Sequence, residues 1–301
     1  MKKKAKFIIG TIAVIGIAAA IIIPKHPLYY LDYEIKDGYA VITDCKDKVK
    51  KVDIPEKIFG HNVEGIAAHA FSVCEAEEIN IPDTIRFIDL GAFSLCKNIT
   101  YIEIPDSVEC MASDIFANCD KLVSVKLPEK LKCINWTSYE SYLSIHDYSE
   151  IKDMIPFNMF DHCQNFKKID IPDNVTSISS EAFMGCNSLK EISLPEQLKE
   201  IWTDAFSYCT SLEKITFPDN LEIIKERAFL ECDSLVEVTI PASVTEIGDY
   251  AFGYYMLGGE IIDGRDTSEY KLNDDFIIKG YKNTVAEKYA KENNIEFIAL
   301  D

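Results

Sequence analysis

Cysteine is the residue whose type and spacing in this chain could do chemistry. Seven of the ten cysteines stand three residues after a phenylalanine, in a Phe-x-x-Cys step that recurs along the 301 residues. A thiol in that place could be a metal ligand, half of a disulfide, a nucleophile or part of an apolar core. The seven are Cys74, Cys96, Cys119, Cys163, Cys186, Cys209 and Cys232. The elements that position these thiols decide between the four roles.

The thiols belong to a regular sequence repeat. It is marked by eight prolines in the repeat phase, each of which follows an aliphatic or aromatic residue. They are Pro55, Pro82, Pro105, Pro128, Pro172, Pro195, Pro218 and Pro241. The long step from Pro128 to Pro172 holds extra sequence between Ile134 and Phe160. Eight phenylalanines share one phase, and they are Phe71, Phe93, Phe116, Phe160, Phe183, Phe206, Phe229 and Phe252. A sustained period of about 23 residues predicts a solenoid.

Each unit predicts three short elements. The Leu-x-x-Ile-x-Ile-Pro segment alternates at its end with period two, which predicts a short strand with one buried face. Proline ends this strand because it has no N–H to donate to a ladder. A Val-x-x-Ile segment predicts a second extended piece, and the Ala-Phe-x-x-Cys segment predicts a single helical turn. Units stacked about 4.8 Å apart would then share one continuous core.

The repeat resembles that of a known family. The unit IPDNVTSISSEAFMGCNSLKEISLP (171–195) is similar to the BspA-like leucine-rich repeats of surface proteins from bacteria and some protists, and the likeness covers about residues 50–257. The segment 33–45 resembles the family's N-terminal β-hairpin cap, and 277–300 resembles its C-terminal β-α-β cap. In the latter, Thr284-x-x-Glu287 predicts a capping box that opens a short helix, and Ile295–Leu300 a closing strand.

The residues before the repeats predict a membrane anchor. Lysines precede an uncharged run from Phe7 to Ile23, which would span roughly 26 Å as a helix, near the lower limit for crossing a bilayer. Because the lysines come first, residues 28–301 are expected outside the cytoplasm. The alternative is secretion after signal cleavage, for which Ala18-x-Ala20 is an acceptable site.

The predicted organisation therefore has four parts. Residues 1–27 form the signal anchor with one transmembrane helix, and residues 28–50 form the N-terminal cap. Residues 51–257 form a mainly β leucine-rich-repeat solenoid with an insertion at 135–159, and residues 258–301 form a loop and the C-terminal cap.

The phased thiols are best explained as core residues. Side chains at one phase point the same way into the stack, whereas a disulfide needs Cβ atoms turned toward each other and zinc needs four converging ligands. Buried thiols also have raised pKa values and are poor nucleophiles. Cys110 and Cys133 differ, since they stand one period apart at a phase expected to face outward. They are the best disulfide candidate, and the alternative is two free thiols near the surface. The sequence assigns Cys45 no role.

Other chemistry has little support in the sequence. His162 lies between Asp161 and Cys163, but Cys163 belongs to the core phase, and no known catalytic or nucleotide-binding motif occurs. We therefore expect no enzyme activity, no metal and no cofactor. The net charge is −19 for the chain, and residues 28–301, with 26 of the 31 basic and all 50 acidic side chains, carry −24. Nucleic acid is an unsuitable partner for such a surface.

Surface residues remain as the candidates for binding. The strand positions four and two before each proline predict an exposed, mostly polar stripe, in which Tyr101 is the one residue typical of an interface anchor. The insertion holds Trp136, Tyr139, Tyr142 and Tyr148. Insertions in repeat arrays often carry binding, although these aromatic residues could instead pack on the neighbouring coil. A second interruption, Gly253–Asp275, predicts a flexible loop.

The resemblance implies a non-catalytic surface protein of the adhesion type. Such a protein would bind another protein or a surface glycan, and it would contact the membrane through residues 7–23. Two alternatives stay open: a structural envelope protein, and a recognition subunit of a surface complex.

Overall fold

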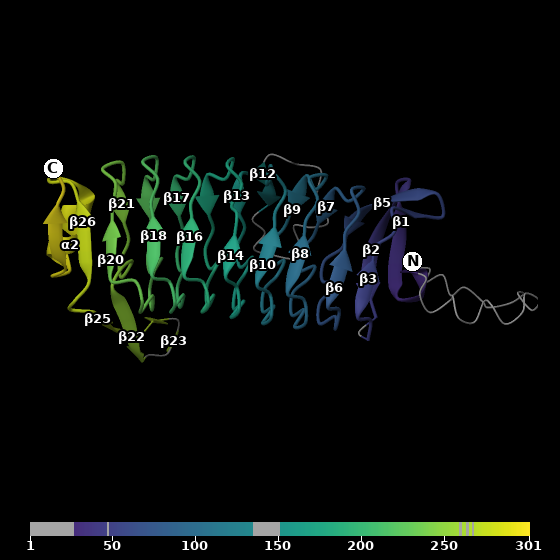
Figure 1. Cartoon of the computed structure of the whole chain (residues 1–301), viewed down its shortest axis with the longest axis horizontal. Coiled ribbons are helices and arrows are strands. Elements are labelled where there is room, and N and C mark those ends of the chain that lie inside the picture. The colour runs from purple at the N-terminus through teal and green to yellow at the C-terminus, as the bar shows by residue number, and fades with distance from the viewer. Residues whose placement is uncertain (1–26, 47, 135–150, 259–260, 263–264, 267) are drawn as a thin grey trace, which may run out of the picture.

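The structure, a computed structural model, describes residues 27–46, 48–134, 151–258, 261–262, 265–266 and 268–301. It is an elongated stack of short coils along one axis, which confirms the predicted solenoid (Figure 1). Strands and turns make up nearly all of it, and the described residues contain one α-helix.

Each coil contributes one short strand to a row that we call the first sheet. Its strands are β3 (Lys51–Asp53), β6 (Glu78–Asn80), β8 (Tyr101–Glu103), β10 (Ser124–Lys126), β14 (Lys168–Ile169), β16 (Glu191–Ser193), β18 (Lys214–Thr216) and β20 (Glu237–Thr239). Pairs within the row are parallel, with Ile102 beside Val125 as an example. In the three-residue strands the central side chain is buried and most of its neighbours are exposed, as the alternation predicts.

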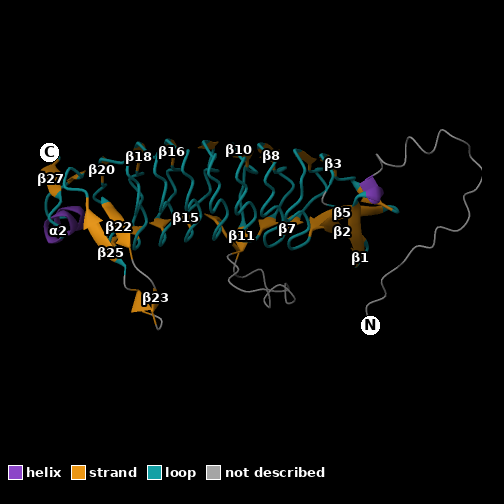
Figure 2. Cartoon of the chain, turned by 90° about the horizontal axis from the view of Figure 1, so that it is seen from below, coloured by secondary structure: helices purple, strands orange, loops and turns teal. Residues whose placement is uncertain are grey.

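A second row of strands, the second sheet, lies along another side of the stack (Figure 2). Its strands are β5 (His61–Ile66), β7 (Phe87–Ile88), β9 (Cys110–Met111), β11 (Cys133–Ile134), β13 (Met154–Ile155), β15 (Ser177–Ile178), β17 (Glu200–Ile201), β19 (Ile223–Ile224) and β21 (Glu246–Ile247). Its repeat strands also pair in parallel, so that Ile178 lies beside Ile201 in the next coil. These strands are the predicted second extended pieces.

The Ala-Phe-x-x-Cys segment is a turn without helix, so the predicted helical turn is wrong. Around Phe206, Asp204 and Tyr208 have left-handed backbone, with φ of 57° and 61°. The alternation of backbone conformation aims alternate N–H groups out of the segment. Those of Asp204, Phe206 and Tyr208 donate to carbonyl groups of the next coil at 3.1, 2.8 and 2.8 Å. A helix would keep its bonds internal, whereas these turns form a third ladder between coils.

The phenylalanines of the turns form the centre of the core. From Phe71 to Phe252, successive rings stack with centroid distances of 5.0 to 5.7 Å. Each ring is at most 1% exposed. Burial of one such side chain contributes about 1.5–3 kcal/mol before conformational entropy is counted. The stack of rings therefore joins the coils end to end.

The stack begins with a β-hairpin at the N-terminal end. A short 3₁₀ turn, η2 (Pro27–Tyr29), leads into β1 (Leu31–Lys36), which pairs antiparallel with β2 (Tyr39–Cys45). β2 then pairs in parallel with β5, and β4 (Lys57–Ile58) pairs antiparallel with β5. Among the described residues no helix is long and apolar enough to cross a bilayer, and the predicted anchor at 7–23 lies outside them.

The stack ends with a strand, a helix and a strand. β26 (Ile277–Gly280) pairs in parallel with both β20 and β27 (Glu296–Ala299), and α2 (Val285–Glu292) connects β26 to β27. Thr284 is the N-cap residue, but its hydroxyl donates to the carbonyl of Tyr281, and Glu287 accepts from the N–H of Asn283. The helix is therefore where the sequence predicts it, without the bonds of a capping box.

The second interruption of the repeat is not a featureless loop. β22 (Tyr254–Gly258) pairs antiparallel with β25 (Glu269–Leu272), and β23 (Ile261–Ile262) pairs with β24 (Arg265–Asp266). The N–H of Met256 donates to the carboxylate of Glu231 at 2.7 Å, which ties this hairpin to the preceding coil. The expectation of a flexible loop is thus replaced by paired strands.

The insertion interrupts the strand pairing of the second sheet, whereas the first-sheet strands on either side of it still pair. β12 (Ile151–Lys152) pairs antiparallel with β11, so that the described strands of the second sheet fall into two groups. β10 and β14 lie on either side of the insertion and pair directly. Met154, Ile155 and Met159 are buried in the following coil. The predicted insertion at 135–159 is therefore too long, because the repeat resumes at Met154.

Candidate interaction surface

The phased cysteines lie in the core, as predicted, and each is bonded there. Six of them donate an S–H to the phenylalanine carbonyl of the preceding coil at 3.0 to 3.3 Å, Cys209 to Phe183 among them. Burial raises the pKa of Cys209 to about 12. A buried, protonated thiol is a poor nucleophile, so this ladder is structural.

Cys110 and Cys133, the best candidates for a disulfide in the sequence, are both free thiols. Cys133 is fully buried, whereas Cys110 is partly exposed. The cause is a change of register: Cys110 lies beside Phe87, a full period away, but Cys133 lies beside Met111, which is one position short of a period. A shift of one residue moves a strand side chain to the opposite face.

His162, Asp161 and Cys163 do not converge on one point. Nδ1 of His162 lies 2.6 Å from the carboxylate of Asp161, while Sγ of Cys163 donates to the carbonyl of Phe116 in the core. Burial raises the pKa of Asp161, and the contact with His162 partly offsets this. Within the described ranges, no group of three His, Cys, Asp or Glu side chains could hold a metal ion.

The outer face of the first sheet is an extended exposed surface of the stack. Its side chains pair across neighbouring strands: Lys126 with Glu103 at 2.5 Å, and Lys51 with Glu78 at 2.6 Å. The bond to Glu103 raises the pKa of Lys126, so this lysine stays charged at neutral pH. Because charges of both signs alternate here, this face differs from the strongly acidic chain as a whole.

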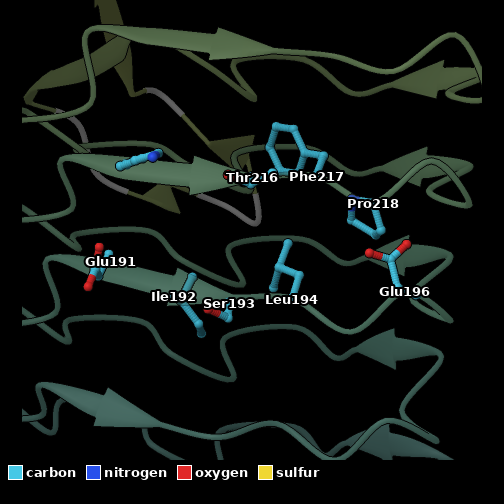
Figure 3. Close-up of a pocket in the computed structure, with 9 residues that line it drawn as sticks. Glu191, Ile192, Ser193, Leu194, Glu196, Thr216, Phe217 and Pro218 are labelled. Atoms are coloured by element: carbon cyan, nitrogen blue, oxygen red, sulfur yellow. The ribbon is translucent and has the colours of Figure 1, made fainter.

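Hollows open between strands of this face. One, of about 350 Å³, lies between β16 and β18, and Figure 3 shows Glu191, Phe217 and Pro218 around it. Another, of about 500 Å³, lies between β18 and β20 and includes Tyr281. A third, of about 820 Å³, lies between β10 and β14. Hollows of this size suit side chains or sugar rings of a partner.

The largest of these three hollows contains one of the predicted site residues. Tyr101, which is 49% exposed, lines it together with Lys126 and Lys168. Pro128 and Pro172, two of the phased prolines, lie at the same hollow. Sequence reasoning missed this grouping, although the shared phase of the two prolines was a signal that their coils are neighbours.

The other predicted site residues, Trp136, Tyr139, Tyr142 and Tyr148, lie outside the described residues. The ends of their segment are described, and they belong to β11 and β12 of the second sheet. The strands that flank the insertion therefore belong to a different sheet from the one that presents Tyr101.

The repeat matches the model of a known protein family. The family model described as "BspA type Leucine rich repeat region" matches residues 44–152 and 153–262, with six copies.

The chain belongs to the BspA-type leucine-rich repeat family.

Solved structures agree with the fold of this BspA-type protein. A leucine-rich repeat protein of T. pallidum (TpLRR) matches 70% of this chain and 90% of its own, with a TM-score of 0.57 and 24% identity. A leucine-rich repeat protein of Eubacterium ventriosum ATCC 27560 matches 64% of this chain, with a TM-score of 0.50 and 21% identity. The match spans only 48% of that second protein. No curated protein sequence matches the chain.

Proposed function

We propose that this BspA-type protein is a non-catalytic, membrane-anchored surface protein that binds another protein or a surface glycan through the first sheet. The observation that carries the proposal is the hollow of about 820 Å³ between β10 and β14, with the half-exposed ring of Tyr101 beside it. Repeat proteins generally bind through such extended faces, and tyrosine is enriched among residues that dominate binding energy.

The polar groups around the hollow suit a polar partner. Lys168 lies 4.0 Å from Asp170, and both side chains are largely exposed, so this weak pair can exchange for contacts with a ligand. Ile169 and Ile171 supply the apolar floor. A carbohydrate or a peptide loop that stacks on Tyr101 and accepts hydrogen bonds from the lysines would fit this chemistry.

The insertion is proposed as a second contact. Trp136, Tyr139 and Tyr142 are residues of the kind that anchor interfaces. Because the strands that flank the insertion belong to the second sheet, we expect its contact to be separate from that of Tyr101. Loss of one contact should therefore leave the other in place.

Both ends of the stack are proposed to be caps. At the C-terminal end, the rings of Phe276 and Tyr289 lie 6.3 and 6.4 Å from that of Phe252, the last phenylalanine of the repeat. The N-terminal hairpin similarly places buried Ile42 next to the first coil. Solenoids need such caps to cover the terminal apolar layers.

The test compares two faces of the full-length protein displayed on cells. We expect Tyr101→Ala to lower adhesion to immobilised host-matrix protein or glycan by about tenfold or more, as for a central interface tyrosine. Trp202→Ala is the matched control, because Trp202 is 40% exposed and follows β17 of the second sheet. A combined alanine variant of Trp136, Tyr139 and Tyr142 tests the insertion.

Each outcome of this test decides between the candidates. Loss of adhesion with Tyr101→Ala and retention with Trp202→Ala supports the first sheet. If neither Tyr101→Ala nor the insertion variant changes adhesion or the proteins recovered with it, the proposal is wrong. Recovery of the protein only with envelope components would favour the structural role.

A further inference from the structure

Cys74, the first of the phased cysteines, has a different neighbour from the others. From Cys96 onward each core thiol in the ladder donates to the phenylalanine carbonyl of the coil before it. Cys74 belongs to the first coil, and the layer before it is the β1–β2 hairpin, whose sequence contains no Phe-x-x-Cys step. In that layer the facing group is the thiol of Cys45, and the two Sγ atoms are 3.5 Å apart.

A strand pairing and a backbone hydrogen bond bring Cys45 and Cys74 together. β2 pairs with β5 so that Ile42 lies beside Ile66, and the N–H of Ala67 donates to the carbonyl of Ile42 at 2.8 Å. This bond fixes the end of β2 against the start of the first Phe-x-x-Cys turn. Cys45 is the last residue of β2, Cys74 ends the turn, and both side chains are buried. The thiols are thus held in contact by backbone structure on both sides.

We propose that Cys45 and Cys74 are a site of oxidative modification, at which a disulfide fastens the N-terminal hairpin to the first coil. A disulfide has an S–S length of about 2.05 Å, so the sulfurs need to approach by roughly 1.5 Å. The hairpin carries Cys45 at its end, where such a shift is local. Each of the later phased thiols donates to a phenylalanine carbonyl oxygen. The Cys45 thiol contacts the carbonyl oxygen of Lys46 at 3.9 Å in addition to the sulfur of Cys74.

The reaction is a two-step exchange with a small-molecule disulfide such as oxidised glutathione. The thiolate of one cysteine attacks a sulfur of the reagent, whose S–S bond breaks, and one reduced thiol leaves. The second cysteine attacks the mixed disulfide and releases the second reduced thiol. The protein loses two S–H bonds and gains one S–S bond, and the two protons end on the two released thiols.

The folded protein controls the rate of this exchange. The hydrogen bond with Cys74 and burial both raise the pKa of Cys45, which keeps it protonated at neutral pH. Oxidation therefore occurs while the chain folds, or when the hairpin opens locally. Once formed, the bond closes the loop from Cys45 to Cys74 and restricts the unfolded chain.

The experiment uses the full-length protein refolded with and without oxidised glutathione. After unfolding and alkylation with iodoacetamide, we expect two of the ten thiols to be protected, with Cys45 and Cys74 in one linked peptide pair. The oxidised form should unfold about 5–10 °C higher than the reduced form. Dithiothreitol should abolish both differences.

Two variants keep the outcome decisive. Cys45→Ala should lose the linked pair and the oxidation-dependent rise in melting temperature, whereas Cys110→Ala, which removes a partly exposed thiol, should keep both. The proposal is overturned if all ten thiols are alkylated after oxidative refolding, or if the linkage maps to another pair. It rests on the thiol geometry alone, so loss of partner binding through the first sheet would leave it unaffected.

Discussion

Each coil contains two regions under opposite constraints: the Phe–Cys turn and the strand of the first sheet. In the turn, Phe206 and Cys209 contact the same residue types in neighbouring coils, so successive units need the same side chains. In the strand, the outward side chains of Lys214 and Thr216 face solvent, and other units have glutamate or tyrosine there. Contact between coils preserves the sequence of the turn, while exposure leaves the sheet free to acquire a partner.

The largest loss of stability should come from a substitution in the Phe–Cys turn. Phe206→Ala should lower the free energy of unfolding by about 3–5 kcal/mol, because it removes a fully buried ring that stacks on two others. Tyr101→Ala should change it by less than about 0.5 kcal/mol, because half of that ring is exposed. Urea denaturation measures both, and similar losses would break the distinction between the two regions.

The core thiol should show a smaller effect with a characteristic pH dependence. Cys209→Ala should lower stability by about 1–2 kcal/mol at pH 7, from lost burial and the lost bond to Phe183. The pKa of Cys209 is raised from 9.0 to about 12 by burial, so the unfolded chain releases this proton first. Its stabilisation is therefore complete below pH 9 and is lost as the pH rises toward 12.

Denaturation curves at pH 7 and pH 10.5 test this difference. The deficit of Cys209→Ala relative to the natural protein should shrink at the higher pH. A deficit that is constant with pH would mean that the thiol titrates normally in the folded state.

Loss of a partly buried ion pair in the turns should lower stability more than loss of an exposed ion pair. Arg227 and Asp204 lie on neighbouring turns and form a two-pronged contact with a shortest distance of 2.9 Å, with side chains 24% and 15% exposed. Asp204→Ala should cost about 1–2 kcal/mol, since it leaves a partly buried guanidinium without its main partner. Lys190→Ala removes an exposed pair with Glu213 and should leave the stability nearly unchanged. Thermal unfolding of both variants provides the comparison, and equal costs would contradict it.

The smallest change in stability should be an increase, caused by a substitution at a left-handed position of a turn. Val73 occupies a left-handed position of the first turn, with φ of 65°, and its side chain is exposed. Val73→Gly should raise stability by about 0.5–1 kcal/mol, because a β-branched residue is strained there and glycine is not. Val236 is also exposed but outside the left-handed region, so Val236→Gly should lower stability. Stabilisation by both changes, or by neither, would argue against strain at the turn.

Features that repeat with the period could be predicted from the sequence. Eight phased phenylalanines predict a ring stack, since residues one period apart are neighbours in any solenoid. The turn itself could not be assigned, because a helical turn would also bury Phe206 and Cys209 three residues apart. Gly91, Gly185 and Asn118 at the left-handed positions were a usable signal, but other coils place larger residues there.

Features that break the period were harder to predict. The choice of Cys110 and Cys133 as disulfide candidates assumed constant register, and a shift of one residue in β11 places the two side chains on different faces. The sequence assigned Cys45 no role because it lies in the N-terminal hairpin, outside the repeat, while the thiol that it contacts lies in the first coil. For the candidate site, alternation was sufficient to place Tyr101 outward, whereas the hollow beside it depends on the shapes of two coils in contact.

The bond from each core thiol to the preceding Phe carbonyl also bears on how the molecule can change length. Cys186 and Cys209 make the same bond to the same kind of partner, so the junction on either side of a coil is nearly identical. Removal or duplication of one whole repeat between them would recreate a junction that already exists. Such coils can replace one another without loss of contacts between coils. Recombination within the gene could therefore lengthen the exposed sheet in steps of about 4.8 Å while the core contacts stay the same.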